Sequence, residues 1–242
     1  MKKICLWSGP RNISTALMYS FAQREDTRVI DEPLYGHYLR ITNADHPGRE
    51  EVLKNMNCDG NSVMRDIMNQ RESNFKILFL KQMSHHLQDL NNEFLQKVDN
   101  IFLIRDPKEV IPSLTIQLPN AKVRDTGLDI QWRLYQSLIS YGKNPVIIDS
   151  RELLIDPEFI LTKLCAHLGI NYSKKMLQWS PGPINEDGIW SKYWYQTVHK
   201  SSTFMPYKPK PDLPKKFIPL YDKCIPYYNK LYKHALIAKR SY

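Results

Sequence analysis

The sequence contains few cysteines and no long apolar run. Its four cysteines lie far apart and lack the short spacings of metal sites. Two of them, Cys5 and Cys165, fall in apolar patterns and are predicted to be reduced core residues. No segment approaches the roughly 18 apolar residues of a membrane helix, and too little apolar chain precedes the first predicted strand for a signal peptide. These absences predict a cytoplasmic protein without membrane contact.

Basic residues outnumber acidic ones but form no nucleic-acid motif. The chain has 34 Lys and Arg against 25 Asp and Glu, a formal charge of +9. This excess favours anionic partners such as a polyphosphorylated nucleotide. The basic residues are scattered along the chain, and no nucleic-acid-binding motif occurs. We therefore predict a small anionic ligand and no nucleic acid.

The 242 residues, 42% of them hydrophobic, suit one domain. Predicted strands and helices alternate, which is typical of an α/β fold, a three-layer α/β/α sandwich with a mainly parallel sheet. Residues 170–242, rich in Pro and Tyr, are expected to pack on this domain (1–242) as a C-terminal extension. The predicted strands are 3–7, 28–31, 76–80, 100–104 and 145–149. The predicted helices are 14–23, 85–96, several between 107 and 142, and 157–168, with an irregular or helical stretch at 45–72.

The most informative segment runs from Trp7 to Leu17, with the sequence Trp-Ser-Gly-Pro-Arg-Asn-Ile-Ser-Thr-Ala-Leu. It predicts a strand, a tight turn and a helix. Free amides and the positive end of a helix dipole converge at such a turn, and Arg11, Ser14 and Thr15 add donors. We therefore predict a phosphate site, although the second Gly and the Lys of a nucleotide-triphosphate loop are missing. The alternative is an ordinary helix start capped by Asn12 or Ser14.

A second segment combines a buried strand with a polar end. The apolar run from Val98 to Ile104 is followed by Arg-Asp-Pro, which predicts a parallel strand opening into a helix at Pro107. Arg105 would then face the crevice where open α/β sheets bind nucleotides, and Ser113 could return a hydroxyl to the same place. The alternative for Arg105 is a surface charge.

These residues resemble the sulfotransferases that use 3'-phosphoadenosine 5'-phosphosulfate. Pro10-Arg11-x-x-Ser14-Thr15 resembles their 5'-phosphosulfate loop, and Arg105 with Ser113 resembles their 3'-phosphate signature. The resemblance implies the P-loop nucleotide-hydrolase-like sulfotransferase fold, that phosphosulfate as cofactor, a small-molecule acceptor with a hydroxyl or amine, and no metal. The cofactor-binding residues that it implies are Gly9, Pro10, Arg11, Asn12, Ser14, Thr15, Arg105, Ser113, Trp190 and Lys200.

The helix predicted at 157–168 supports the same resemblance. Asp156 would cap it, Pro157 suits its first position and Gly169 its end. In the family a similar Pro-initiated helix ending in Leu-Gly follows a core strand.

The resemblance also implies catalytic residues. Arg11 is the counterpart of the family's loop lysine, and Lys81, after the strand 76–80, is placed to bridge donor and acceptor. Two candidates compete for the base. Glu32 follows the strand 28–31 and resembles the base of the trehalose and heparan branches, whereas His85 or His86 follows Lys81 two positions later than the catalytic His of cytosolic sulfotransferases. We prefer Glu32 on position, although a carboxylate would need a raised pKa for this task.

The segment from Gly182 to Ser202 resembles the carboxy-terminal loop with which sulfotransferases close their site. Its Asp-Gly-x-Trp and His-Lys-Ser patterns resemble a poorly characterised branch sometimes labelled aminotransferase-like. Two departures from the family stand out. Ile13 occupies a position where Gly is usual, and Pro112 is expected to kink the second binding helix or delay its start.

Two alternatives stay open at this point. A nucleoside or small-molecule kinase would hold magnesium at acidic strand ends, which Asp31 and Asp149 resemble. A catalytically silent nucleotide-binding or scaffold protein would keep the fold without turnover. The acceptor pocket is expected from the loops 34–72 and 115–127.

Overall fold

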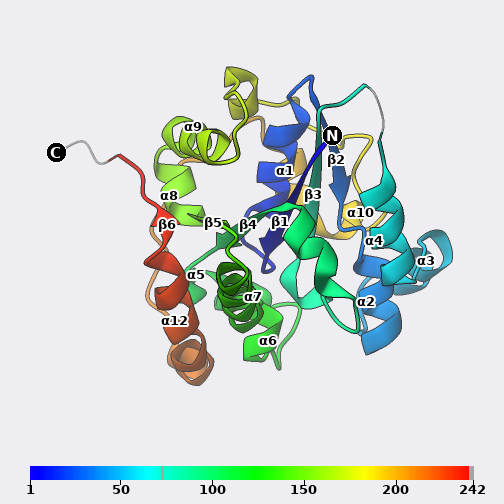
Figure 1. Cartoon of the computed structure of the whole chain (residues 1–242). Helices are drawn as coiled ribbons and strands as arrows, with labels where there is room; N and C mark the ends of the chain where they lie inside the picture. The colour runs from blue at the N-terminus through cyan, green and yellow to red at the C-terminus, as the bar shows by residue number, and fades with distance from the viewer. Residues whose placement is uncertain (72–73, 240–242) are drawn as a thin grey trace.

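The computed structural model describes residues 1–71 and 74–239 (Figure 1). Residue 72, with which the predicted stretch 45–72 ends, and residues 240–242 of the predicted extension lie outside this range. A sheet of six strands has the order β2-β3-β1-β4-β5-β6, and every neighbouring pair is parallel. The first five strands confirm the sequence prediction. The bounds are β1 Lys2–Ser8, β2 Thr27–Asp31, β3 Ile77–Met83, β4 Asp99–Ile104, β5 Val146–Asp149 and β6 Ala235–Leu236.

The sheet buries both of its faces, each in its own apolar core. Successive side chains of a strand point to opposite faces, so Ile4 and Leu6 of β1 enter one core while Cys5 and Trp7 enter the other. The first core is covered by α1 (Ser14–Ala22), α8 (Ser150–Ile155) and α9 (Pro157–His167). The second is covered by α4 (Gly60–Asn69), α7 (Leu128–Ser140) and α12 (Ile218–Tyr232). The three-layer α/β fold is confirmed.

Helix ends follow the predicted capping chemistry. The Asp156 side chain accepts from the Phe159 amide at the start of α9, and Gly169, with φ +64°, follows its end. Helix α5 (Pro107–Leu114) starts at Pro107, capped by Asp106. Pro112 does not delay that start, so this part of the expectation is wrong. A proline at the sixth position removes a hydrogen bond only from the second turn of so short a helix.

Three segments between the strands differ from the prediction or add to it. Residues 85–96 are not one helix but two 3₁₀ turns, η1 (Ser84–His86) and η2 (Asn92–Lys97), because the Asn91 side chain accepts from the Glu93 amide and starts a separate turn. The loops expected for the acceptor contain helices. The remaining elements are α2 Tyr35–Thr42, α3 Arg49–Asn55, α6 Val123–Thr126, η3 Lys174–Leu177, α10 Ser191–Trp194, α11 Gln196–His199 and η4 Lys215–Phe217.

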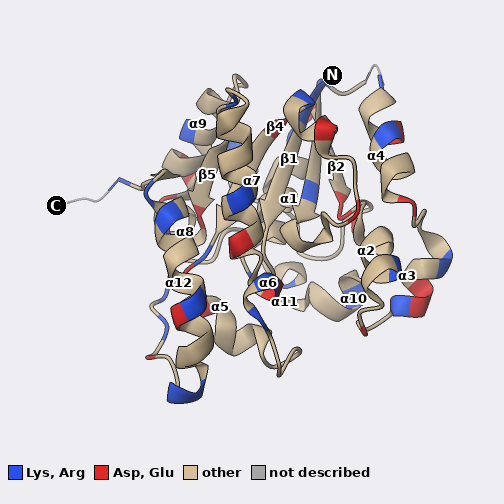
Figure 2. Cartoon of the chain, turned by 60° about the horizontal axis from the view of Figure 1, so that its bottom comes forward, with Lys and Arg blue, Asp and Glu red and all other residues tan. Residues whose placement is uncertain are grey.

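The C-terminal segment contributes to both the sheet and a core. Strand β6 pairs with β5, and α12 packs against α7 and α5. Its buried side chains are Cys224, Tyr228 and Leu231. Basic and acidic residues are spread over helices on both sides of the sheet (Figure 2). Within the described residues, no helix is long and apolar enough to cross a membrane.

Hydrogen bonds and one close contact hold the carboxyl ends of the central strands together. The Gln131 side chain donates to the carbonyls of Trp7 at 2.8 Å and Leu103 at 3.1 Å, which joins β1 to β4. A Cβ on Gly9 would lie 2.1 Å from the carbonyl oxygen of Thr126. Glycine at this position is therefore required by the packing of the turn after β1.

We expect Gly9→Ala to lower the free energy of unfolding by about 3 kcal/mol, since two backbone segments must separate. Gly142→Ala is the matched control, because its new Cβ meets no atom within 4 Å and only its φ of +69° is unfavourable, at a cost of about 1 kcal/mol. Urea denaturation of both variants measures the difference. Equal losses would contradict the proposed contact.

Candidate functional site

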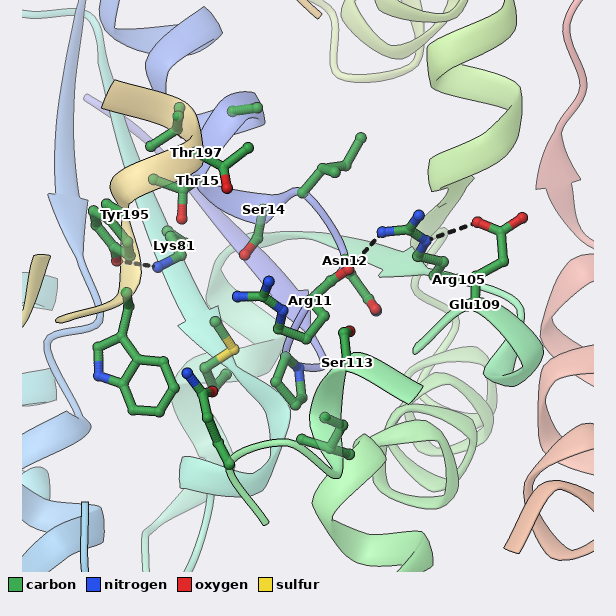
Figure 3. Close-up of a pocket in the computed structure, with 18 of the residues that line it drawn as sticks. Arg11, Asn12, Ser14, Thr15, Lys81, Arg105, Glu109, Ser113, Tyr195 and Thr197 are labelled. Atoms are coloured by element: carbon green, nitrogen blue, oxygen red, sulfur yellow. Dashed lines mark hydrogen bonds and ion pairs between the residues drawn. The ribbon is translucent and has the colours of Figure 1, made fainter. Parts of the chain in front are cut away.

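A cavity of about 590 Å³ lies at the carboxyl ends of the strands (Figure 3). This edge, between β1 and β4, is where open α/β sheets bind ligands. Figure 3 shows Lys81 and Tyr195 on one side of the cavity, Arg105 and Glu109 on the other, and Arg11 between them. Two predicted residues, Gly9 and Lys200, are not among those that line the cavity. The predicted residues that line it are Pro10, Arg11, Asn12, Ser14, Thr15, Glu32, Lys81, His85, His86, Arg105, Ser113 and Trp190.

The backbone is strained where it meets this cavity. Arg11, Ile13 and Glu32 have φ angles of +63°, +58° and +38°, the left-handed region that side chains disfavour. Such strain gathers at functional sites, where the surrounding fold maintains it. Ile13 is the position where the family usually has Gly, and its φ gives the physical reason for that preference.

The N-terminus of α1 has no side-chain cap. Its N-cap residue is Ile13, so the alternative of a cap by Asn12 or Ser14 is wrong. The Asn12 side chain instead donates to the Leu103 carbonyl at 3.1 Å and ties the loop to β4. The first amides of a helix have no partner within it, so those of α1 remain available to an anion at the cavity.

Two guanidinium groups lie beside each other at the β4 side of the cavity. Arg105 donates to the Arg11 carbonyl at 2.8 Å and to Glu109 at 2.9 Å. No carboxylate among the described residues pairs with Arg11. Burial, and then the charge of Arg105, lowers the pKa of Arg11. Two arginines with one carboxylate leave a positive charge that a phosphate would neutralise.

The segment after residue 204 adds lysines that the sequence analysis missed. Lys208 and Lys210 line the cavity, whereas Lys200, the predicted residue, is exposed outside its lining. Tyr207 holds this segment beside Arg105, because its hydroxyl donates to Glu109 at 2.8 Å. In the sequence, Lys208 and Lys210 stand out only by their position near Tyr207 in a Pro-rich stretch.

Lys81 is fully buried, and its ammonium group has three partners. Nζ donates to Asp31 at 2.9 Å, to Glu32 at 2.5 Å and to the hydroxyl of Tyr195 at 2.5 Å. An ammonium has three N–H donors, so all are in use. Lys81 could bridge donor and acceptor, as the resemblance implies, only by releasing one of these partners.

Burial sets the protonation of this cluster. Burial raises the pKa of Glu32, and Asp31 adds to the rise, while Lys81 opposes it without cancelling it. Burial acts to lower the pKa of Lys81, but the two carboxylates more than offset it and raise the pKa. The pKa of Tyr195 lies far above its ordinary value, owing to burial and then to the same carboxylates. Lys81 is therefore charged, Tyr195 neutral, and Glu32 the carboxyl group able to take up a proton.

His85 and His86 form an uncharged wall of the same cavity. Burial lowers the pKa of His85 to about 3, with smaller contributions from His46 and Arg124, and lowers that of His86 well below its ordinary value. The His86 ring stacks on Tyr38, with ring centroids 4.6 Å apart. An imidazole with so low a pKa is a weak base at neutral pH. Both histidines therefore line the cavity as neutral rings, while the pKa of Glu32 is raised.

The Asp-Gly-x-Trp and His-Lys-Ser patterns of residues 182–202 attach this segment to the rest of the fold. Asp187 accepts from Tyr19 of α1 at 2.6 Å and from His199 at 2.9 Å. The Gly188 amide donates to Asp31 at the end of β2 at 3.1 Å, and a Cβ here would lie 2.1 Å from the ring of Trp190. These contacts hold the segment, and with it Tyr195, over the cavity.

Both aspartates that suggested a kinase already have protein partners. Asp31 belongs to the Lys81 cluster. Asp149 accepts from the amide of Arg151 at 2.8 Å and from the hydroxyl of Tyr228 at 3.0 Å. Across residues 1–71 and 74–239, no group of three or more His, Cys, Asp and Glu side chains is arranged to hold a metal ion. Both carboxylates are therefore engaged in contacts that hold the fold together.

Sequence comparison finds relatives over nearly the whole chain. A family profile described as "Sulfotransferase domain" matches residues 1–235. Branched-chain-amino-acid aminotransferase-like protein 2 of Arabidopsis thaliana is 41% identical over 236 residues, which cover 97% of this chain but 42% of that protein. The related protein 1 of the same plant is 40% identical over 231 residues, with 95% and 41% covered. The chain thus spans less than half the length of these relatives.

Solved structures share the fold. A sulfotransferase from Alicyclobacillus acidocaldarius has a TM-score of 0.56 at 11% identity and covers 98% of this chain and 97% of its own. The sulfotransferase domain of the Synechococcus PCC 7002 olefin synthase has a TM-score of 0.52 at 16% identity, with 92% and 94% covered. At these identities the likeness concerns the fold alone.

We expect Lys81→Met to lower the free energy of unfolding near pH 7 by about 3–5 kcal/mol, because two buried carboxylates lose their cation. The loss of stability should be smaller near pH 5, because protonation of Glu32 removes a negative charge that Met cannot pair. Lys175→Met, which removes the exposed partner of Glu25, is the control and should change stability little. Urea titrations at both pH values measure this. A small, pH-independent loss for Lys81→Met would contradict the charged cluster.

Proposed function

Since the chain belongs to the sulfotransferase domain family, we propose that it transfers a sulfuryl group from 3'-phosphoadenosine 5'-phosphosulfate to a hydroxyl or amine of a small molecule. The membership confirms the predicted family and supports a sulfotransferase-type activity. The single observation that carries the proposal is that one cavity is lined both by Arg11, which pairs with no carboxylate among the described residues, and by the buried Glu32.

The positive side of the cavity fits the donor nucleotide. Arg11 has no carboxylate partner among the described residues, and the first amides of α1 lack a cap, so both could hold the 5'-phosphosulfate. Arg105 and Ser113 would hold the 3'-phosphate, with Lys208 nearby. When bound, this nucleotide supplies an activated sulfuryl group and a phosphate leaving group.

The transfer needs a base for the acceptor and a cation for the leaving phosphate. Glu32 would take the proton of the acceptor while the acceptor oxygen or nitrogen forms a bond to sulfur. The bond between sulfur and the 5'-phosphate oxygen breaks, and its electron pair remains on the phosphate. Arg11 would stabilise the negative charge that develops there. The raised pKa of Glu32 suits this role, because a base works best when its pKa is near the working pH.

The aminotransferase-like names of the curated relatives describe proteins more than twice as long as this chain. A Schiff-base lysine must be neutral to attack a carbonyl. Lys81, the buried lysine of this cavity, has a raised pKa and three hydrogen-bond partners. The cavity therefore supports sulfuryl transfer better than pyridoxal chemistry.

We expect adenosine 3',5'-bisphosphate to bind about tenfold or more tightly than adenosine 5'-phosphate, because the 3'-phosphate gains charge-assisted contacts. Arg105→Ala should remove the difference. Arg133→Ala should preserve it, since Arg133 pairs with Asp129 on α7 and does not line the cavity. Calorimetric titration measures the affinities. Equal affinities in the wild type would refute the 3'-phosphate site.

We expect Glu32→Gln to reduce sulfuryl transfer about 100-fold or more, since the substitution removes the base. Adenosine 3',5'-bisphosphate should still bind, because Glu32 makes no contact with a phosphate in this proposal. The wild-type kcat/KM should fall as the pH falls through the raised pKa of Glu32. His85→Ala should be milder. A radiolabelled donor tested against hydroxyl and amine acceptors measures transfer. If His85 were the base, activity would persist down to about pH 3, where its pKa lies. No transfer to any acceptor, with the bisphosphate bound, would favour a silent protein.

A further inference from the structure

The cluster around Lys81 contains two carboxylates that look alike in sequence but not in their contacts. Asp31 accepts from Lys81 at 2.9 Å, from the Tyr195 hydroxyl at 2.7 Å and from the Gly188 amide at 3.1 Å. Glu32 uses one oxygen, Oε1, for Lys81. Its other oxygen makes no hydrogen bond to any residue that the structure describes, and Glu32 lines the cavity where Asp31 does not.

Tyr195 joins these groups with a hydroxyl whose hydrogen bonds are complete. It accepts from Lys81 at 2.5 Å and from Nε1 of Trp190 at 3.1 Å, and it donates to Asp31. A hydroxyl has one donor and two acceptor positions, so none is left for a ligand. The phenol is 5% exposed and comes from the segment that Asp187 and Gly188 fasten over the cavity.

We propose that Asp31 and Tyr195 are positioning residues that hold Lys81 in place and thereby leave Glu32 as the carboxylate of this cluster with an oxygen free for the acceptor proton. This inference rests on the proposed function and deepens it. Both residues act through Lys81, whose three donors are divided among Asp31, Glu32 and Tyr195.

The charges of the cluster explain why two carboxylates are needed. Asp31 neutralises Lys81, so Glu32 adds a net negative charge when ionised and none when protonated. Without Asp31, Lys81 would pair with Glu32 alone and favour its ionised form, which makes a weaker base. Among the described residues, Tyr35 of α2 also interacts with Glu32, and His86 of η1 stacks on Tyr35 with ring centroids 5.2 Å apart; burial keeps both rings neutral.

The sheet offers a matched control. Asp149 is also a buried aspartate at the carboxyl end of a strand, and it accepts from a tyrosine hydroxyl, that of Tyr228. It lies on β5, four strand positions from β2, or about 19 Å at the usual strand spacing. Asp149→Asn and Tyr228→Phe therefore repeat the chemistry of the test variants outside the cluster.

The experiment titrates the Glu32 carboxyl by ¹³C NMR in glutamate-labelled protein bound to adenosine 3',5'-bisphosphate, with the signal assigned by its loss in Glu32→Gln. We expect Asp31→Asn to shift the titration downward by about one pH unit or more, and to move the acid limb of kcat/KM with it. Asp149→Asn should leave the Glu32 titration and the acid limb of kcat/KM unchanged. Tyr195→Phe keeps every charge, so it should lower kcat about tenfold with little change in KM or in the titration. Tyr228→Phe should leave kcat unchanged.

Each outcome decides between the two proposals. An unmoved Glu32 titration in Asp31→Asn, or an equal shift in Asp149→Asn, would overturn the positioning role even if Glu32→Gln is inactive. Should Asp31→Asn fail to fold, wild-type turnover in Tyr195→Phe would overturn it instead. Full activity in Glu32→Gln would remove the base assignment, and with it the proposed function of Glu32, whatever the titration shows.

Discussion

The three hydrogen bonds of the Lys81 ammonium are the interaction on which the site depends. A fully buried cation costs several kcal/mol unless carboxylates pair with it and every donor finds an acceptor. Asp31, Glu32 and Tyr195 meet both conditions, and they come from β2, the residue after it, and the C-terminal segment. These hydrogen bonds therefore join strand, loop and closing segment around Glu32, a carboxylate that lines the cavity.

Strain and packing place the donor side of the cavity. Ile13 and Arg11 hold left-handed backbone conformations, which cost free energy that the surrounding sheet must offset. Asn12 and Gly9, both expected to bind the cofactor, make contacts that do so, since one donates to Leu103 and the other packs against Thr126. Their direct contact with a nucleotide stays a prediction. The loop thus needs these residue types for its shape.

The two sides of the cavity differ in charge, which separates their tasks. Arg11, Arg105 and the lysines at 208 and 210 make one side positive. On the other side, Tyr35, Tyr38 and the imidazoles of His85 and His86 line the cavity, and burial keeps both imidazoles neutral. An anionic donor and a small acceptor with a removable proton fit this division, as the membership in the sulfotransferase domain family leads one to expect.

The sequence alone determined the alternation of strands and helices, the first five strands, the caps of α9 and the strand, turn and helix at residues 2–22, because hydrophobic period and capping chemistry are local. It also brought Arg11, Glu32, Lys81 and Arg105 together, since the carboxyl ends of parallel strands meet at one edge. Only the tertiary structure decided that Lys81 is saturated, that Lys208 lines the cavity where Lys200 does not, and that Tyr195 reaches Asp31 across 164 positions. Burial and long-range hydrogen bonds depend on how distant segments pack, and no local pattern of residues records them.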